Sequence, residues 1–347
     1  MKKVIDNFIP QGGKHCITNS LKQIFSYYHH PMSEEVIFGL ASGLSFLYIN
    51  QAHSPMVNGR TKVFEFEKKL AERLNITIKC KSSKDYTKVL NDTKTMIDHD
   101  NPVLIYADMP YLSYLGMNPD SHFGGHAVVL FGYDDSTQKF WLSDRDNHDY
   151  PIRVPKGQIK QDYHIVDYKE IEKARSSAYR PFPANNKYLI FDFNGYKKVD
   201  KTMIQDAIKE TCESMLNPPA QLIGINGIKK FSKEILKWKQ FHTNKLKTAG
   251  ITNYFQINKD GGTGGGIFRR MYGEFLIEVA PIVKNESLST IGKNFIKLSE
   301  KWDAIAKDMW QLSLTADITL LDKMSASISE IYGEERDLYI ALKEIID

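Results

Sequence analysis

The pattern of apolar residues changes near residue 196, and this change divides the chain into two parts. Before it, helical stripes alternate with short apolar runs that are rich in β-branched and aromatic residues. After it, apolar residues recur at helical spacing over long stretches with no strand-like run between them. The sequence therefore predicts an α+β domain over residues 1–195, followed by an all-helical domain over residues 196–347.

The length and composition agree with two ordinary globular domains. At roughly 150 residues per domain, the 347 residues of the chain correspond to two domains, and 25% of the residues are charged. Three cysteines are too few for a disulfide framework, so each is interpreted as a thiol in a reducing compartment. The net charge of +4 is spread along the chain, which disfavours a nucleic-acid partner. No apolar stretch approaches the roughly 18 residues of a membrane span, so we expect a cytoplasmic protein without a membrane partner.

Cys16 stands where a nucleophilic cysteine is expected. It follows the turn Gln11-Gly12-Gly13 and opens a helical stripe of apolar residues. A helix N-terminus lowers the pKa of a thiol, because its backbone N–H groups stabilise the thiolate. The alternative is a small buried apolar side chain, which is how we interpret Cys80 and Cys212.

A nucleophilic cysteine needs a base and a group that orients the base. His126 opens an apolar run, and Asp144 ends the next one in a predicted antiparallel hairpin, so their side chains can meet on neighbouring strands. Asp146 is an alternative to Asp144, and both residues of the pair could instead be structural. Gln11, five residues before Cys16, is a candidate oxyanion donor. The order cysteine on a helix, then histidine and aspartate on strands, is that of papain-type enzymes.

Zinc or iron binding is a competing use of the same residues. The candidate ligands are His15, Cys16, His126 and Asp144. Adjacent residues on a helix diverge, which makes His15 and Cys16 a poor chelating pair. His122 is spaced for a helical pair with His126, but the intervening Phe-Gly-Gly disfavours a helix. We therefore expect neither a metal site nor a cofactor.

A glycine-rich segment precedes a predicted helix over residues 267–280. A glycine loop that leads into a helix can hold an anionic group, and two arginines follow in the first turn. The segment lacks the Lys-Ser/Thr of a phosphate-binding loop, and a flexible connector or a tight packing turn is the alternative. The candidate substrate-binding residues are Gly262, Thr263, Gly264, Gly265 and Arg269.

Two sets of residues resemble the family of butirosin biosynthesis protein H. The first set resembles the N-terminal domain of that family and consists of His15-Cys16-Ile17-Thr18-Asn19-Ser20-Leu21, Ser33-Glu34-Glu35, Phe38-Gly39-Leu40, Gly125-His126-Ala127-Val128-Val129, Gly132-Tyr133-Asp134-Asp135 and Leu142-Ser143-Asp144-Arg145. The second set resembles the helical domain that follows in that family. It consists of Gly262-Thr263-Gly264-Gly265-Gly266-Ile267-Phe268-Arg269-Arg270-Met271-Tyr272 and Phe275-Leu276. The resemblance spans nearly the whole chain.

The resemblance implies a fold similar to papain-like and bacteriocin-processing cysteine peptidases. It also implies an acyltransferase that takes an aminoacyl group from an acyl carrier protein and places it on an amine of an aminoglycoside. Cys16 would be the nucleophile, His126 the base and Asp144 the orienting residue. Gln11 departs by one position from the papain-like glutamine, which stands six residues before the cysteine.

The helical domain would cover the cleft and bind the small amine acceptor or the phosphopantetheine arm of the carrier. Two alternatives to transfer remain. One is a cysteine peptidase or amide hydrolase with the same three residues. The other is a binding module without enzymatic activity, in which Cys16 is structural.

Overall fold

The structure is a computed structural model that describes residues 1–51, 54–145, 163–180 and 182–346. The chain divides into two compact units. The first unit combines Met1–Glu34 with Asn75–Tyr196, and the second combines Glu35–Leu74 with Lys197–Asp347. The division at residue 196 coincides with the change in the apolar pattern. Residues 35–74, in contrast, lie within the predicted first domain but group with the second unit.

The first unit is built on an antiparallel sheet. Its strands are β1 (Lys2–Val4), β4 (Thr77–Lys81), β5 (Val103–Ala107), β6 (His126–Asp134), β7 (Lys139–Ser143), β8 (His164–Asp167) and β9 (Tyr188–Asp192). The strand order is β4-β9-β5-β6-β7-β8, and β1 pairs with β6. Strands β6 and β7 form the hairpin that the sequence predicts, with Tyr133 opposite Phe140. This sheet confirms the α+β class of the first unit.

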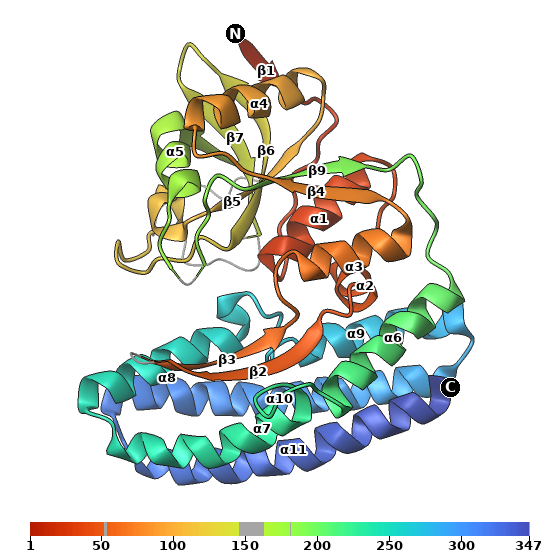
Figure 1. The fold of residues 1–347 in the computed structure, drawn as a ribbon, viewed down its shortest axis with the longest axis vertical. Coiled ribbons are helices and arrows are strands. Elements are labelled where there is room, and N and C mark those ends of the chain that lie inside the picture. Colours follow the sequence, from red (N-terminus) through yellow and green to blue (C-terminus); the bar gives the residue numbers. More distant parts are fainter. Residues whose placement is uncertain (52–53, 146–162, 181, 347) are drawn as a thin grey trace. The chain divides into compact units, whose positions relative to one another are not determined.

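Helices bury both faces of this sheet (Figure 1). They are α1 (Cys16–Tyr27), α4 (Tyr86–Asp98) and α5 (Tyr168–Ser176), with short 3-10 helices at Met109–Tyr111 and Ser113–Leu115. Every residue of β6 is buried, which requires cover on both sides. Ile24 of α1, Ile97 of α4 and Ile171 of α5 join the strands in one apolar core.

Helix α1 follows the predicted apolar stripe. Ile17, Leu21 and Ile24 are completely buried, so the hydrophobic face of the helix fixes its rotation about its own axis. The helix ends at Tyr27. His29 then adopts a left-handed conformation at φ 64°, two residues ahead of Pro31. The first residue of this helix is Cys16, so the rotation of the helix also sets the direction of the thiol.

The second unit is helical apart from one hairpin. Its helices are α2 (Glu34–Leu40, whose first residue belongs to the first unit), α3 (Glu65–Leu74), α6 (Lys201–Leu216), α7 (Gly224–Glu234), α8 (Thr243–Ile257), α9 (Arg269–Val283), α10 (Glu286–Thr315) and α11 (Thr319–Ile346), with 3-10 turns at Ile235–Gln240 and Lys259–Gly261. All elements from α6 onward are helices, as predicted. The hairpin β2 (Leu44–Asn50) and β3 (Pro55–Arg60) packs on α7 and α8.

Helix α10 lies against α8, α9 and α11. The α9 and α10 backbones touch where Gly273 meets Gly292, because a Cβ atom on either glycine would lie 2.5 Å from the carbonyl oxygen of the other. Among the helices of the described residues, none combines the length and apolar character needed to cross a membrane.

Candidate active site

Cys16 is the first residue of α1, and its side chain is buried. The preceding residue, His15, has extended backbone angles and caps the helix without a side-chain hydrogen bond. The backbone dipoles of α1 therefore place a positive partial charge at the end of the helix where the thiol lies. This position favours a thiolate over a neutral thiol.

His126 and Asp144 meet as the hairpin predicts. Nε2 of His126 lies 2.6 Å from Oδ2 of Asp144, and both side chains are buried. Cys16 is within side-chain hydrogen-bonding reach of the His126 ring. Because Asp144 occupies Nε2, Nδ1 is the ring nitrogen left for the thiol. The structure thus brings together three predicted residues, while Asp146 lies outside the described residues.

The charges of this pair favour an imidazolium beside a carboxylate. Burial alone would lower the pKa of His126, but the charge of Asp144 and the hydrogen bonds with Asp144 and Cys16 raise it above its usual value. Burial would likewise raise the pKa of Asp144. Instead it is lowered, because His126, the Tyr114 hydroxyl and the nearby charge of Arg145 stabilise the carboxylate. The Tyr114 hydroxyl donates to Oδ2 of Asp144 at 2.8 Å.

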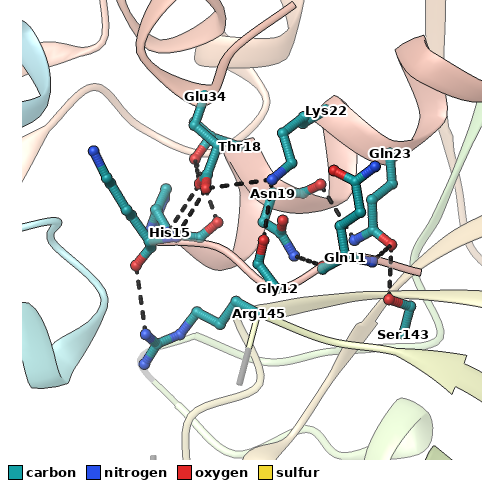
Figure 2. Close-up of polar contacts among 11 residues, drawn as sticks. Gln11, Gly12, His15, Thr18, Asn19, Lys22, Gln23, Glu34, Ser143 and Arg145 are labelled. Atoms are coloured by element: carbon teal, nitrogen blue, oxygen red, sulfur yellow. Dashed lines mark hydrogen bonds and ion pairs between the residues drawn. The ribbon is translucent and has the colours of Figure 1, made fainter. Parts of the chain in front are cut away.

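The two neighbours of Asp144 fasten the end of β7 to the segment around Cys16 (Figure 2). On one side, the Ser143 hydroxyl donates to Oε1 of Gln23 on α1 at 2.7 Å. On the other side, the backbone carbonyl of Arg145 accepts the Gly13 N–H at 3.1 Å. The guanidinium of Arg145 donates to the Lys14 carbonyl at 3.4 Å. These bonds hold the segment around Cys16 next to Asp144.

A buried carboxylate supports the turn that leads to Cys16. Glu34 accepts the backbone N–H groups of Lys14 at 2.8 Å and His15 at 3.1 Å, and the Thr18 hydroxyl at 2.7 Å (Figure 2). A Cβ atom on Gly13 would lie 2.3 Å from Oε1 of Glu34, so a larger residue there would displace this carboxylate. Burial raises the pKa of Glu34, while these hydrogen bonds oppose that change.

Gln11 is fixed through its backbone. Its N–H donates to Oε1 of Gln23 at 3.1 Å, and its carbonyl accepts the Asn19 side-chain amide at 2.9 Å. Figure 2 shows the Gln11 side chain running beside that of Gln23, farther along α1 than His15. A contribution of the Gln11 amide to an oxyanion site stays a prediction.

A second histidine–aspartate pair lies at the same end of the sheet. Ala107 pairs with His126 in the sheet, and the next residue, Asp108, is completely buried. Asp108 bonds Nδ1 of His122 at 2.8 Å and accepts the Phe123 N–H at 2.7 Å. This carboxylate therefore holds the segment that leads into His126.

The glycine-rich loop lies in the second unit and packs on α10. The Gly265 N–H donates to the Thr263 hydroxyl at 3.1 Å, and the Gly266 N–H donates to Asp303 at 2.8 Å. Gly262, Gly264 and Gly265 have positive φ angles. Arg269 is completely buried and forms a bidentate pair with Glu335. These contacts fit the packing alternative, and substrate binding by these residues stays a prediction.

Among the described residues, no three histidine, cysteine, aspartate or glutamate side chains gather as metal ligands would. The contacts of His126 with Asp144 and with Cys16 fit proton transfer to and from a thiol.

Two models of known protein families match the chain, one in its N-terminal part and one in its C-terminal part. The family model described as butirosin biosynthesis protein H, N-terminal, matches residues 15–145, which contain Cys16, His126 and Asp144. Residues 15–145 belong to the butirosin biosynthesis protein H-like N-terminal family. A second family model, described as a domain of unknown function (DUF4872), matches residues 169–342, half of the chain. The comparison with curated protein sequences found no match to this chain. The family match confirms the resemblance drawn from the sequence motifs.

Five residues that hold the site together were not predicted from the sequence to belong to it. They are Gln23, Glu34, Tyr114, Ser143 and Arg145. Ser143 and Arg145 carried a signal, since they flank the predicted aspartate, and Glu34 belongs to one of the motifs that resemble the family. Gln23 and Tyr114 act through contacts between distant parts of the chain, which no local pattern reports.

Proposed function

We propose that this protein is a thiol-dependent acyltransferase. It moves an acyl or aminoacyl group from an acyl carrier protein to a small amine, with Cys16 carrying the group between them. The observation that supports this proposal is the contact series from Cys16 to His126 to Asp144 at the N-terminus of α1. A cysteine, a base and an orienting carboxylate are the parts required for covalent acyl transfer.

In the first half of the reaction, the Cys16 thiolate attacks the carbonyl carbon of the carrier thioester. A bond forms between Sγ and the acyl carbon, and the bond to the sulfur of the carrier breaks. The departing thiolate takes a proton from the His126 imidazolium. The dipole of α1 favours the negative charge that develops beside its N-terminus.

In the second half, the amine nitrogen attacks the acyl carbon on Cys16. Neutral His126 accepts a proton from the amine as the new amide bond forms. The bond between Sγ and the acyl carbon then breaks, which restores the Cys16 thiolate and the His126 imidazolium. Asp144 keeps the ring oriented and stabilises its charged form in both halves.

The family supports the biological setting of this reaction. The matching N-terminal model is named for butirosin biosynthesis, so we propose a biosynthetic role in the production of an aminoglycoside-type antibiotic. A cytoplasmic location, where acyl carrier proteins are loaded, fits three cysteines that are all in the thiol form.

Intact-protein mass spectrometry tests the first half of the reaction. After incubation with acyl-pantetheine thioesters, we expect the mass to increase by one acyl group. The increase should be absent in Cys16→Ala and unchanged in Cys80→Ser. Cys80 is exposed and lies outside the site, so its interpretation as a buried side chain was wrong. A wild-type protein that gains no acyl group and keeps its fold would contradict the proposal and favour a binding module.

Adding an amine to the acylated protein distinguishes transfer from hydrolysis. Transfer predicts that an aminoglycoside amine removes the acyl group faster than buffer alone and yields an amide. Release at the same rate with and without amine, yielding only the free acid, would instead identify a hydrolase.

A further inference from the structure

A completely buried arginine in the first unit carries an unused hydrogen-bonding edge. Arg175 lies in the last turn of α5, and its side chain is inaccessible to solvent. Among the described residues, no carboxylate forms an ion pair with it, and no acceptor bonds its Nε and Nη2 atoms. A buried donor without an acceptor is unfavourable, so these two donors indicate a missing acceptor.

The other contacts of Arg175 fix the direction of that edge. Nη1 donates to the Thr93 hydroxyl at 2.9 Å, and this hydroxyl in turn donates to the Val89 carbonyl at 2.8 Å. The guanidinium lies over the Tyr188 ring, with its central carbon 5.8 Å from the ring centroid. The group is therefore held on one edge and one face, and Nε and Nη2 present two donors from the remaining edge.

A second unsatisfied group lies close to the same place. The Tyr86 hydroxyl, at the start of α4, is buried and has no hydrogen-bond partner among the described residues. Tyr86 lies on the same helix as Thr93, which bonds Arg175, and it interacts electrostatically with the guanidinium. The Tyr188 hydroxyl, in contrast, is already used, since it donates to Asp92 at 2.8 Å. Three buried donor atoms from two side chains thus lack an acceptor in one region.

Arg269 in the second unit shows what this edge binds when an acceptor is present. It too is completely buried, and its Nε and Nη2 atoms donate to the carboxylate of Glu335, with Nη2 at 2.7 Å. The paired donors of a guanidinium match an anionic acceptor in this bidentate arrangement. The two buried arginines differ in that a carboxylate accepts hydrogen bonds from Arg269, whereas Asp92, which interacts electrostatically with Arg175, accepts the Tyr188 hydroxyl and leaves Nε and Nη2 of Arg175 without an acceptor.

We propose that the Nε–Nη2 edge of Arg175 and the Tyr86 hydroxyl bind a small inorganic anion, of the size and charge of chloride. The site lies where α4, α5 and β9 meet, and the complete burial of the Arg175 side chain favours a small anion over a substrate carboxylate. A negative ion satisfies the donors and also balances the buried charge, whereas a water molecule would only satisfy the donors.

The anion would stabilise the part of the first unit next to the candidate active site. The Arg175 carbonyl accepts the Asn186 N–H at 2.6 Å, and the Ala174 carbonyl accepts the Asp108 N–H at 2.8 Å. Asp108 in turn holds His122 and Phe123, ahead of His126. The end of α5 therefore links the anion site to the segment that positions the base. This inference does not depend on the proposed acyl transfer.

Bromide, which replaces chloride and scatters anomalously, tests the site directly. Crystals of the full-length protein grown or soaked in sodium bromide should show an anomalous peak within hydrogen-bonding distance of Nε and Nη2 of Arg175. A peak that is absent in Tyr86→Phe crystals would also place the hydroxyl in the site. Density for a water molecule without anomalous signal, or a protein acceptor in this position, would overturn the proposal.

Thermal unfolding provides the matching test in solution. At constant ionic strength, replacing sodium gluconate with about 0.2 M sodium chloride should raise the Tm of the wild-type protein by a few degrees. The increase should be smaller in Tyr86→Phe and unchanged in Tyr196→Phe, whose ring stacks on His30 instead. Tyr86→Phe keeps the ring and is expected to fold, unlike a substitution of Arg175. Equal responses of the wild-type protein and Tyr86→Phe to chloride would overturn the role of the hydroxyl, and no response in either would overturn the anion site.

Discussion

Nε2 of His126 lies 2.6 Å from Oδ2 of Asp144, with both side chains buried between the sheet and its helices. The register of β6 and β7, in which Val129 pairs with Ser143, places the two residues at the same end of neighbouring strands. The two residues are 18 positions apart in the sequence but adjacent in the structure, because the hairpin folds the chain back on itself. The pair gives the candidate base a fixed orientation and a fixed charge partner.

The reactivity of Cys16 should persist at pH values where ordinary thiols are protonated. The pKa of His126 is raised, so its ring remains an imidazolium at neutral pH and stabilises the adjacent thiolate. We expect the rate of alkylation by iodoacetamide, measured against pH, to reach half its maximum below pH 7. An unperturbed thiol would do so near pH 8.5.

Two variants make this measurement specific. Cys80→Ser removes the exposed cysteine and should leave the pH profile unchanged. His126→Ala in the same background should shift the midpoint toward about 8.5. A wild-type midpoint already at that value would show that His126 does not activate the thiol.

Asp144→Asn should reduce acyl transfer by about 100-fold or more. The amide has nearly the same shape but no charge, so it no longer stabilises the imidazolium, and it can hold the ring in the wrong tautomer. Single-turnover acylation of Cys16, followed by mass spectrometry, measures the effect. Circular dichroism should show an unchanged fold. A rate within a few-fold of wild type would mean that Asp144 is structural.

Tyr114→Phe should have a much smaller effect. It removes one hydrogen bond to Oδ2 of Asp144 and leaves the bond with His126 in place. Loss of that bond should lower the free energy of unfolding by about 1 kcal/mol. It should also slow acylation by less than about tenfold, equivalent to 1.4 kcal/mol. A loss as large as that of Asp144→Asn would assign the tyrosine a direct part in the chemistry.

Glu34→Gln should destabilise the protein and slow alkylation of Cys16. Both carboxylate oxygens of Glu34 accept hydrogen bonds, so a glutamine must place its NH2 group against a donor. We expect a loss of about 1–3 kcal/mol in the free energy of unfolding, measured by urea denaturation. Glu72→Gln, which changes an exposed ion pair with Lys68, is the control and should cost less than about 0.5 kcal/mol.

Arg269→Met separates a packing role from substrate binding. The substitution leaves Glu335 as a buried charge without its partner, which should cost about 3–5 kcal/mol of stability. Adding Glu335→Leu should restore part of that loss, because the unpaired charge is removed. If Arg269 instead binds substrate, Arg269→Met would raise KM without this change in stability, and the second substitution would restore nothing.

Local patterns in the sequence identified most elements of this fold. The apolar stripe after Cys16 predicted α1, the alternation of short apolar runs predicted the β6–β7 hairpin, and the long stripes after residue 196 predicted the helices from α6 onward. They succeed because hydrophobic periodicity reports which face of an element is buried. The grouping of residues 35–74 with the second unit carries no such signal, since it depends on packing between segments far apart in the sequence.

The sequence by itself determined that Cys16 begins a helix and that His126 and Asp144 lie at the same end of neighbouring strands. Tertiary structure alone decided that Glu34 supports the turn before the cysteine, and that Gln23 and Arg145 tie that turn to the end of β7. It also decided that Arg269 has an acidic partner. The physical reason is the same in each case. Periodicity records which face of an element is buried, whereas a hydrogen bond between buried polar groups depends on where two elements meet.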